Sequence, residues 1–287
     1  MKISTEINSI AKIVGMQRAV ELCGKAGFDA WDLSLFDMCL VDKKTKVPLD
    51  NKSPLNGKDG LKFVRELKRI GNDHGMVCNQ SHAPFPVYVP EIYACLKHAI
   101  ELNAEAGGEI CVIHPDNNKT AEQNAEMYLE LLPFAKECGV KIAAEHMWNW
   151  DHNKNQPTFA ACATCEDFKK HIDTVNDDFL VACLDIGHAE MRTTGDGAVN
   201  MIKALEYRLK ALHIHDNNCF EDLHKIPFSA SVDFAAVIKA LKDINYNGYF
   251  TLEANTFMAA YNADNAFDGV MMLKQSARRL ADMFEQL

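Results

Sequence analysis

The chain has 287 residues, of which 48% are hydrophobic and 24% charged, and its formal net charge is −10 at pH 7. These values predict one large domain, residues 1–287, with a substantial core, and the charge argues against nucleic acid or an anionic membrane as a partner. The chain begins MKISTEINSI without a secretory segment, no apolar run reaches the ~20 residues of a membrane span, and ten cysteines form no regular framework. A cytoplasmic protein is therefore expected.

Short apolar runs alternate with amphipathic segments along the chain. The runs predict strands at 2–7, 30–35, 76–82, 109–114, 140–146, 179–185, 210–216 and 249–254. The other segments predict helices at 16–27, 60–75, 91–107, 120–139, from about 165, and at 197–208, 232–248 and 269–284. Eight strand–helix units indicate an α/β protein and favour a single-domain (β/α)8 TIM barrel. The rival, an open doubly wound sheet, usually has a glycine-rich turn after its first strand, and NSIAKIVGM has one glycine.

Two predicted loops are longer than a barrel needs, at 36–59 and 146–164. Long loops on the catalytic face often shape a substrate pocket, and the second one carries Trp148 and Trp150. The Cys162-x-x-Cys165 pair lacks further zinc ligands nearby and is interpreted as inert. Thr164 is predicted to cap the helix that follows, with Asp167 as its capping-box partner.

Acidic and histidine side chains end one predicted strand after another, where turn residues would be ordinary. The runs are VCNQSHAP, ICVIHPD, KIAAEHM, LVACLDIGH, LKALHIHDN and YFTLEAN. They place these residues at or just after strand ends: His82, His114, Glu145, Asp185, His188, His213 and Glu253. Each alone is typical of a salt-bridged strand end or a hydrogen-bonded core histidine. Because the carboxyl ends of barrel strands meet at one face, the set favours one shared polar site.

Period-two alternation predicts which side chains face the barrel interior. His213 shares a face with Ala211 and His215, and Glu145 shares one with Ala143, so small residues line the space below the proposed site. Carboxylates and imidazoles crowded there without a cation would repel one another and lose hydration. A single divalent ion resolves this conflict, and the oxygen and nitrogen ligands suit Mn²⁺, the first expectation, or Mg²⁺, Zn²⁺ or Co²⁺.

Five motifs in order, AEHMW, CLDIGH, LHIHDNN, DLHKIPFSASVDF and TLEAN, resemble the xylose isomerase-like TIM barrels over essentially the whole chain. That superfamily includes sugar isomerases and epimerases, hydroxypyruvate isomerase, inosose-processing enzymes and endonuclease IV. In the sugar epimerase branch one divalent metal is held by residues from strands five to eight. The matching positions are Glu145, Asp185, His213 and Glu253.

The resemblance also implies roles for individual residues. Glu145 and Glu253 would form the acid/base pair as well as bind the metal, and His188 would contact the substrate. Further substrate contacts are expected from His82, His114 and Trp148. The endonuclease branch uses similar groups in a multi-zinc cluster, and His82, His114, Asp222 and His224 match them. Asp222, His224 and His215 are therefore candidates for additional metal or substrate ligands. Trp150 and Trp31 are other candidates for stacking on a sugar.

One position departs from the family pattern. After Pro227 the family commonly has an acidic residue or glycine and then a glycine, whereas this chain has Ser229 and Ala230. An alanine would be strained if the loop needs a positive φ there. The departure puts the shape of the substrate loop in question and leaves the metal ligands unaffected.

The resemblance implies isomerisation or epimerisation of a small polyhydroxylated ketone or aldehyde. The metal would bind adjacent carbonyl and hydroxyl oxygens and stabilise an enediolate, while one carboxylate removes a proton from carbon and another returns it. A lyase or dehydratase using the same proton abstraction is the alternative, and an endonuclease IV-like phosphodiesterase or a non-catalytic sugar-binding barrel are further ones. The substrate, its phosphorylation, the number of metals and a homo-oligomeric state stay open.

Overall fold

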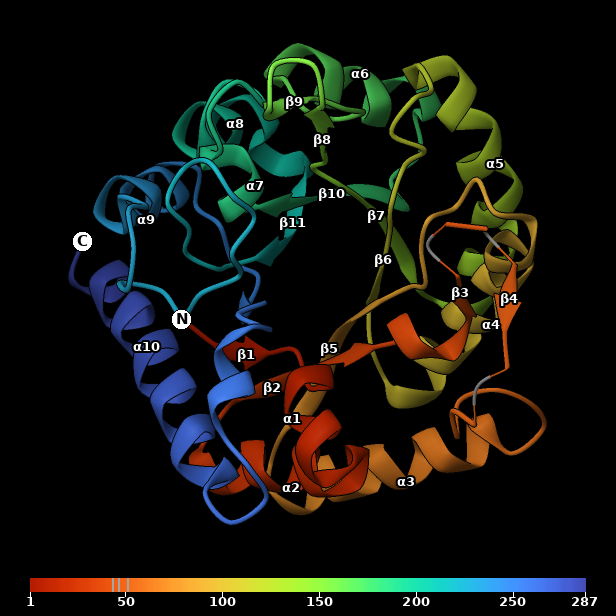
Figure 1. Cartoon of the computed structure of the whole chain (residues 1–287), viewed down its shortest axis with the longest axis vertical. Coiled ribbons are helices and arrows are strands. Elements are labelled where there is room, and N and C mark those ends of the chain that lie inside the picture. Colours follow the sequence, from red (N-terminus) through yellow and green to blue (C-terminus); the bar gives the residue numbers. More distant parts are fainter. Residues whose placement is uncertain (43, 46, 51) are drawn as a thin grey trace.

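Parallel strands form a closed barrel surrounded by helices in the computed structural model, which describes residues 1–42, 44–45, 47–50 and 52–287 (Figure 1). The barrel strands are β1 (Ile3–Thr5), β2 (Ala30–Ser34), β5 (Val77–His82), β6 (Ile110–Ile113), β7 (Lys141–Glu145), β10 (Leu180–Asp185), β11 (Leu209–His213) and β12 (Phe250–Leu252). Six pair in the order β11-β10-β7-β6-β5-β2, and β1 pairs with β12. Parallel bridges between Glu6 and Asp32 and between Ile214 and Leu252 join the two sheets and close the barrel. The predicted (β/α)8 fold is confirmed.

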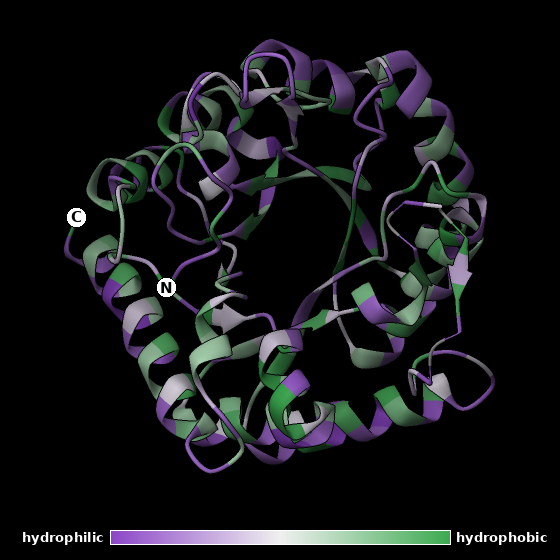
Figure 2. Cartoon of the chain, viewed as in Figure 1, coloured by the Kyte–Doolittle hydropathy of each residue, from purple (hydrophilic) through white to green (hydrophobic). Residues whose placement is uncertain are grey.

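The outer helices bury one face against the strands. They are α2 (Met16–Ala26), α3 (Gly60–Asp73), α4 (Pro90–Ala106), α5 (Ala121–Cys138), α6 (Cys165–Val175), α8 (Ala198–Leu205), α9 (Phe234–Asp243) and α10 (Ala266–Gln286). Each carries both hydrophobic and hydrophilic residues, as amphipathic helices do (Figure 2). Gly27 ends α2 in the left-handed region with φ of 87°, a conformation that glycine adopts without a Cβ clash.

Side chains of small residues fill the barrel interior below its carboxyl end. Val112, Ala143, Val181, Cys183 and Ala211 form an apolar cluster separate from the main core between strands and helices. Strand alternation assigned Ala143 and Ala211 to this space. The cluster supports the polar strand ends above it while leaving room for them to converge.

The structure contains elements that the sequence patterns did not predict. They are α1 (Asn8–Val14), α7 (Ile186–Glu190), the hairpins β3 (Leu40–Val41)–β4 (Pro48–Leu49) and β8 (Trp148–Asp151)–β9 (Gln156–Phe159), and the 3-10 turns η1 (Phe36–Met38), η2 (Glu206–Arg208) and η3 (Phe257–Ala260). Both hairpins lie in the two long loops. Part of the loop predicted at 36–59, residues 43, 46 and 51, lies outside the described residues.

Two local predictions need correction. The strand predicted at 210–216 ends at His213, because residues 214 and 216 form only isolated bridges. The hydroxyl of Thr164 does cap α6 by accepting the N–H of Asp167, but the Asp167 carboxylate accepts the N–H of Cys162 at 2.8 Å and so does not complete a capping box. No helix of the described residues is both long and apolar enough to cross a membrane.

Candidate active site

Four buried side chains from neighbouring strand ends converge at the carboxyl end of the barrel. Glu145 ends β7, Asp185 ends β10, His213 ends β11, and Glu253 follows β12 directly. They are at most 5% exposed, and one ligand atom from each lies within 4.8 Å of all the others. This span is close to the ~4.2 Å between opposite ligands that each lie ~2.1 Å from an ion. The structure therefore brings together the four residues predicted to bind metal.

The nitrogen of His213 that faces this group is Nδ1. It lies 2.6 Å from Glu145 Oε1 and 3.5 Å from Glu253 Oε2. Asp185 has one oxygen, Oδ1, engaged by the backbone N–H of His188 at 2.8 Å, whereas its buried Oδ2 has no hydrogen-bond partner in the described part of the chain. An unsatisfied buried carboxylate oxygen among three other ligand groups is what a cation site requires.

His82 and His114 lie beside the same glutamate. Their Nε2 atoms are 3.1 and 2.9 Å from Glu145 Oε2 and 2.9 Å from each other. His82 ends β5, and His114 follows β6 by one residue. Glu145 consequently belongs to two groups of side chains. Its Oε1 contacts His213 in the central group, and its Oε2 contacts His82 and His114.

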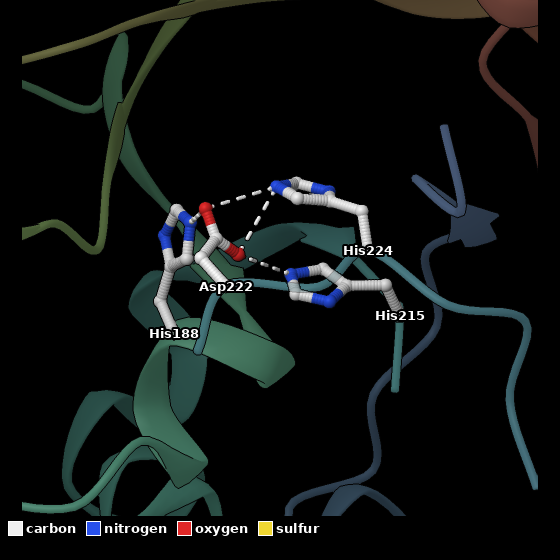
Figure 3. Close-up of side chains that lie close together, drawn as sticks. All are labelled: His188, His215, Asp222 and His224. Carbon is white, nitrogen blue, oxygen red and sulfur yellow. Dashed lines mark hydrogen bonds and ion pairs between the residues drawn. The ribbon is translucent and has the colours of Figure 1, made fainter. Parts of the chain in front are cut away.

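A further group surrounds Asp222 in the loop after β11 (Figure 3). Asp222 Oδ2 lies 3.4 Å from His188 Nε2, and Asp222 Oδ1 lies 3.1 Å from His224 Nε2 and 3.6 Å from His215 Nε2. The rings of His215 and His224 are stacked with centroids 4.0 Å apart. His215 lies on the side of His213, as strand alternation predicted, although β11 ends before it. His215 Nε2 also lies 3.0 Å from Asp185 Oδ1, which links the two groups.

Three of these histidines share one arrangement. Each places Nδ1 within 2.8–2.9 Å of a backbone carbonyl oxygen: His82 with Ala83, His188 with His146, and His224 with Glu253. A carbonyl can only accept, so Nδ1 carries the hydrogen and a neutral ring directs the Nε2 lone pair at a carboxylate. Lone pair and carboxylate repel unless a proton or a metal ion lies between them. Metal-binding histidines commonly show this arrangement.

The electrostatics of these side chains reflect the same requirement for positive charge between them. Burial raises the pKa of Glu145, but the neighbouring His213, His114 and His82 hold it well below its ordinary value. Burial lowers the pKa of His213, whereas Cys183, Glu145 and Glu253 raise it well above the usual range. The groups are thus balanced by protons that a divalent cation would displace on binding.

The site opens into a cavity of about 850 Å³, within the range of ligand pockets. Its floor includes Glu145, Glu253 and Asp222, and its walls include Trp148 and Phe85. The long loops contribute to the walls, as expected. Trp31 does not take part, because it is fully buried in the core, with its indole close to Gly71 of α3. The suggestion that Trp31 stacks on a substrate is therefore wrong.

Sequence patterns did not identify two features of the site. One is Gly187, where a Cβ would lie 1.9 Å from Cε1 of His215, so that only glycine lets this ring pack. In the sequence, the signal for this close packing was that the motif CLDIGH has a glycine directly before His188. The other is His146, whose backbone carbonyl orients His188 and whose side chain is buried. Burial lowers the pKa of His146 to about 4, which keeps its ring neutral.

Comparisons with known proteins agree with this architecture. A family model described as xylose isomerase-like TIM barrel matches residues 20–276. An uncharacterized protein of Methanocaldococcus jannaschii is 27% identical over 257 residues, which cover 82% of this chain and 78% of that protein. An inosose dehydratase of Clostridium perfringens is 24% identical over 155 residues, 48% of each chain.

Similar solved structures include a D-tagatose 3-epimerase-like protein, with a TM-score of 0.69, 20% identity and coverage of 98% of this chain and 99% of that one. An L-ribulose 3-epimerase has a TM-score of 0.70 and 17% identity, covering 100% and 95%. An IolI protein with a bound zinc atom has a TM-score of 0.67 and 18% identity, covering 100% and 99%. At such identities the likeness shows the fold. With a family model matching most of its length, the chain belongs to the xylose isomerase-like TIM barrel family.

Proposed function

We propose that this protein is a divalent-metal-dependent isomerase or epimerase of a small polyhydroxylated ketone or aldehyde. The observation that carries the proposal is the pair of buried carboxylates, Glu145 and Glu253, that flank His213 Nδ1 at the floor of the cavity. Proton abstraction next to a carbonyl needs a base on one side of the carbon and an acid on the same or the opposite side. The names of the epimerase neighbours and of the dehydratase relative support a sugar-like substrate.

The central ion would be held by Glu145, Asp185, His213 and Glu253, a buried set of three carboxylates and one imidazole that suits Mn²⁺, Mg²⁺, Zn²⁺ or Co²⁺. When bound, such an ion polarises a carbonyl and stabilises negative charge on its oxygen. Glu145 and Glu253 would remove and return the proton. His188, at the cavity wall, would orient a substrate hydroxyl, and His82, His114 and Trp148 would complete the contacts.

The charge of the cavity favours an uncharged substrate. Among the described residues that line it, Lys12 is the single lysine or arginine. The acidic residues that line it are Asp37, Asp116, Glu145, Asp222 and Glu253. Even with one divalent ion bound, this lining attracts a phosphate monoester weakly. An unphosphorylated ketose or cyclic polyol ketone is therefore the substrate class we infer.

The test is exchange of substrate carbon-bound protons with solvent deuterium, followed by NMR on a panel of ketoses and inososes with and without a phosphate. We expect exchange on an unphosphorylated compound and its loss in Glu145→Gln and Glu253→Gln. Glu221→Gln, an exposed carboxylate in the neighbouring loop, is the matched control and should keep full exchange. Undiminished exchange in both site variants would remove these glutamates from the reaction.

A dehydratase is the second candidate, and the inosose dehydratase relative favours it. The same base would abstract the proton, but the enolate would then expel a hydroxide from the neighbouring carbon as water, assisted by an acid such as His188. An unsaturated or deoxy-keto product, rather than an epimer, would identify this reaction in the same NMR experiment.

A multi-metal phosphodiesterase is the third candidate. It is favoured by two further groups of metal-ligand side chains, one around Asp222 and one that contains His82 and His114. Two or three ions can stabilise both attacking and leaving oxygens of a phosphate ester. The acidic cavity and the net charge of −10 weigh against a nucleic acid substrate. Cleavage of a duplex containing an abasic site, at low salt and with Zn²⁺ or Mn²⁺, tests this candidate directly.

A further inference from the structure

Polar side chains occupy part of the barrel interior where apolar layers would be ordinary. The buried hydroxyl of Ser4 on β1 donates to Asn79 Oδ1 at 2.6 Å, and Asn79 Nδ2 lies 3.1 Å from Thr251 Oγ1 and 3.2 Å from Gln80 Oε1. Gln80 Nε2 in turn donates to Asp32 Oδ2 at 2.9 Å. All five residues are at most 7% exposed. A buried polar network can cost stability. The residue at which this one ends, Asp32, is therefore a candidate for a functional role.

A β-bulge creates this network. In the pairing of β2 with β5, Trp31 is opposite Cys78 and Asp32 is opposite Gln80, so Asn79 is the extra residue. Successive residues of a regular strand face opposite sides, whereas the bulge lets both Asn79 and Gln80 reach partners inside the barrel. Bulges are frequent beside active sites, where they redirect a side chain.

The hydrogen bonds of Gln80 fix which atoms in this network donate and which accept. Gln80 Oε1 already faces donors, Asn79 Nδ2 at 3.2 Å and the Thr251 hydroxyl at 3.3 Å. Its Nε2 must therefore point the other way, to Asp32, which keeps that carboxylate as an acceptor. Asp32 Oδ2 lies 3.8 Å from His213 Nε2, and Asp32 Oδ1 and His213 Nε2 are buried without a hydrogen-bond partner in the described structure.

We propose that Asp32 is a positioning residue for His213: it accepts the Nε2 hydrogen of this ring, directly or through one water, and so presents the Nδ1 lone pair to the ion. The inference rests on the proposed metal site at Glu145, Asp185, His213 and Glu253. A ligand histidine usually donates its second N–H to a carboxylate, and loss of that partner weakens metal binding about 10- to 100-fold. Cys183 also lies close to His213, but its sulfur is a weak acceptor.

The experiment measures Mn²⁺ affinity of metal-stripped protein by titration calorimetry at pH 7.5. Asp32→Leu, which removes the acceptor, should weaken binding about 10- to 100-fold, and Asp32→Asn, whose amide oxygen still accepts, should weaken it less. The matched control is Glu6→Gln. Glu6 is also buried and pairs with Asp32 through a backbone β-bridge. Its carboxylate oxygens accept hydrogen bonds from Ser9, so the Mn²⁺ affinity of this variant should stay within about twofold of that of the original protein.

A second measurement separates positioning from a structural role and serves if Asp32→Leu does not fold. In Zn²⁺-loaded protein labelled with ¹⁵N-histidine, His213 should carry its hydrogen on Nε2, and Asp32→Asn should shift that proton signal and speed its exchange with water. Unchanged affinity and an unchanged Nε2–H in folded Asp32 variants would overturn the inference while leaving the metal site intact. Absence of Mn²⁺ binding by the unaltered protein would overturn the metal site and this inference together.

Discussion

The backbone N–H of Ala230 donates a 2.8 Å hydrogen bond to the buried carboxylate of Asp216. The N–H groups of Ser229 and Val232 donate to the same carboxylate at 3.0 Å each. One side chain thus holds the end of the loop that carries Asp222 and His224. Ala230 is not among the residues with positive φ, whereas Phe228 has φ of 71°. The absence of glycine at residue 230 therefore causes no backbone strain.

We expect Asp216→Asn to destabilise the protein by about 1.5–3 kcal/mol, because an amide N–H₂ would then face a backbone donor inside the protein. Urea unfolding followed by circular dichroism measures the change. Asp233→Asn is the control, since Asp233 caps α9 and asparagine caps a helix equally well. Equal, small effects in the two variants would contradict the role given to Asp216.

Gly187→Ala should disturb the cluster around Asp222. The new Cβ would lie 1.9 Å from Cε1 and 2.4 Å from both ring nitrogens of His215, and this ring is fully buried. Overpacking of this kind typically costs about 1–3 kcal/mol. A double-mutant cycle with His215→Ala provides the check, because removing the ring should relieve the clash. Additive effects of the two changes, measured by unfolding, would show that the ring is not what the new methyl group meets.

The sequence predicted the barrel and its polar end because both depend on regular repeats. Parallel strands with period-two alternation place Glu145 and His213 at one end without any knowledge of tertiary contacts. The same rule placed His215 on their side correctly, but it did not show that β11 ends at His213, because a strand's end depends on its neighbours. The bulge that turns both Asn79 and Gln80 inward has no marker such as glycine or proline. Helix α1 is seven residues long without a side-chain cap, so its stability comes from packing that no local pattern reveals.

Metal stoichiometry should separate the central site from the cluster around Asp222. The proposed isomerase predicts about one ion per chain by elemental analysis, lost in Asp185→Asn and retained in Asp222→Asn. Asparagine can replace Asp185 as the cap of α7, so loss of the ion there would not merely reflect unfolding. Two or three ions in the unaltered protein, with one lost in Asp222→Asn, would instead support the multi-metal hydrolase.

The buried carboxyl of Glu6 predicts a specific pH dependence of stability. Burial raises its pKa from 4.5 to about 6, against the lowering effect of hydrogen bonds from Ser9. The folded protein therefore binds this proton more tightly than the unfolded chain does, and the contribution to stability is fully present below about pH 4.5 and lost as the pH rises through 6. The difference between these two pKa values corresponds to about 2 kcal/mol of stability. Glu6→Gln has no proton to release.

The free energy of unfolding of the unaltered protein minus that of Glu6→Gln should therefore fall by about 2 kcal/mol between pH 4.5 and 7. Urea titrations of both proteins at several pH values across this window measure the difference. Glu221→Gln, at an exposed position, controls for general charge effects and should give a flat difference over the same range. A difference that stays constant or rises with pH for Glu6→Gln would mean that the folded protein does not raise the pKa of Glu6, and that this carboxylate is ionised inside the barrel wall at little cost.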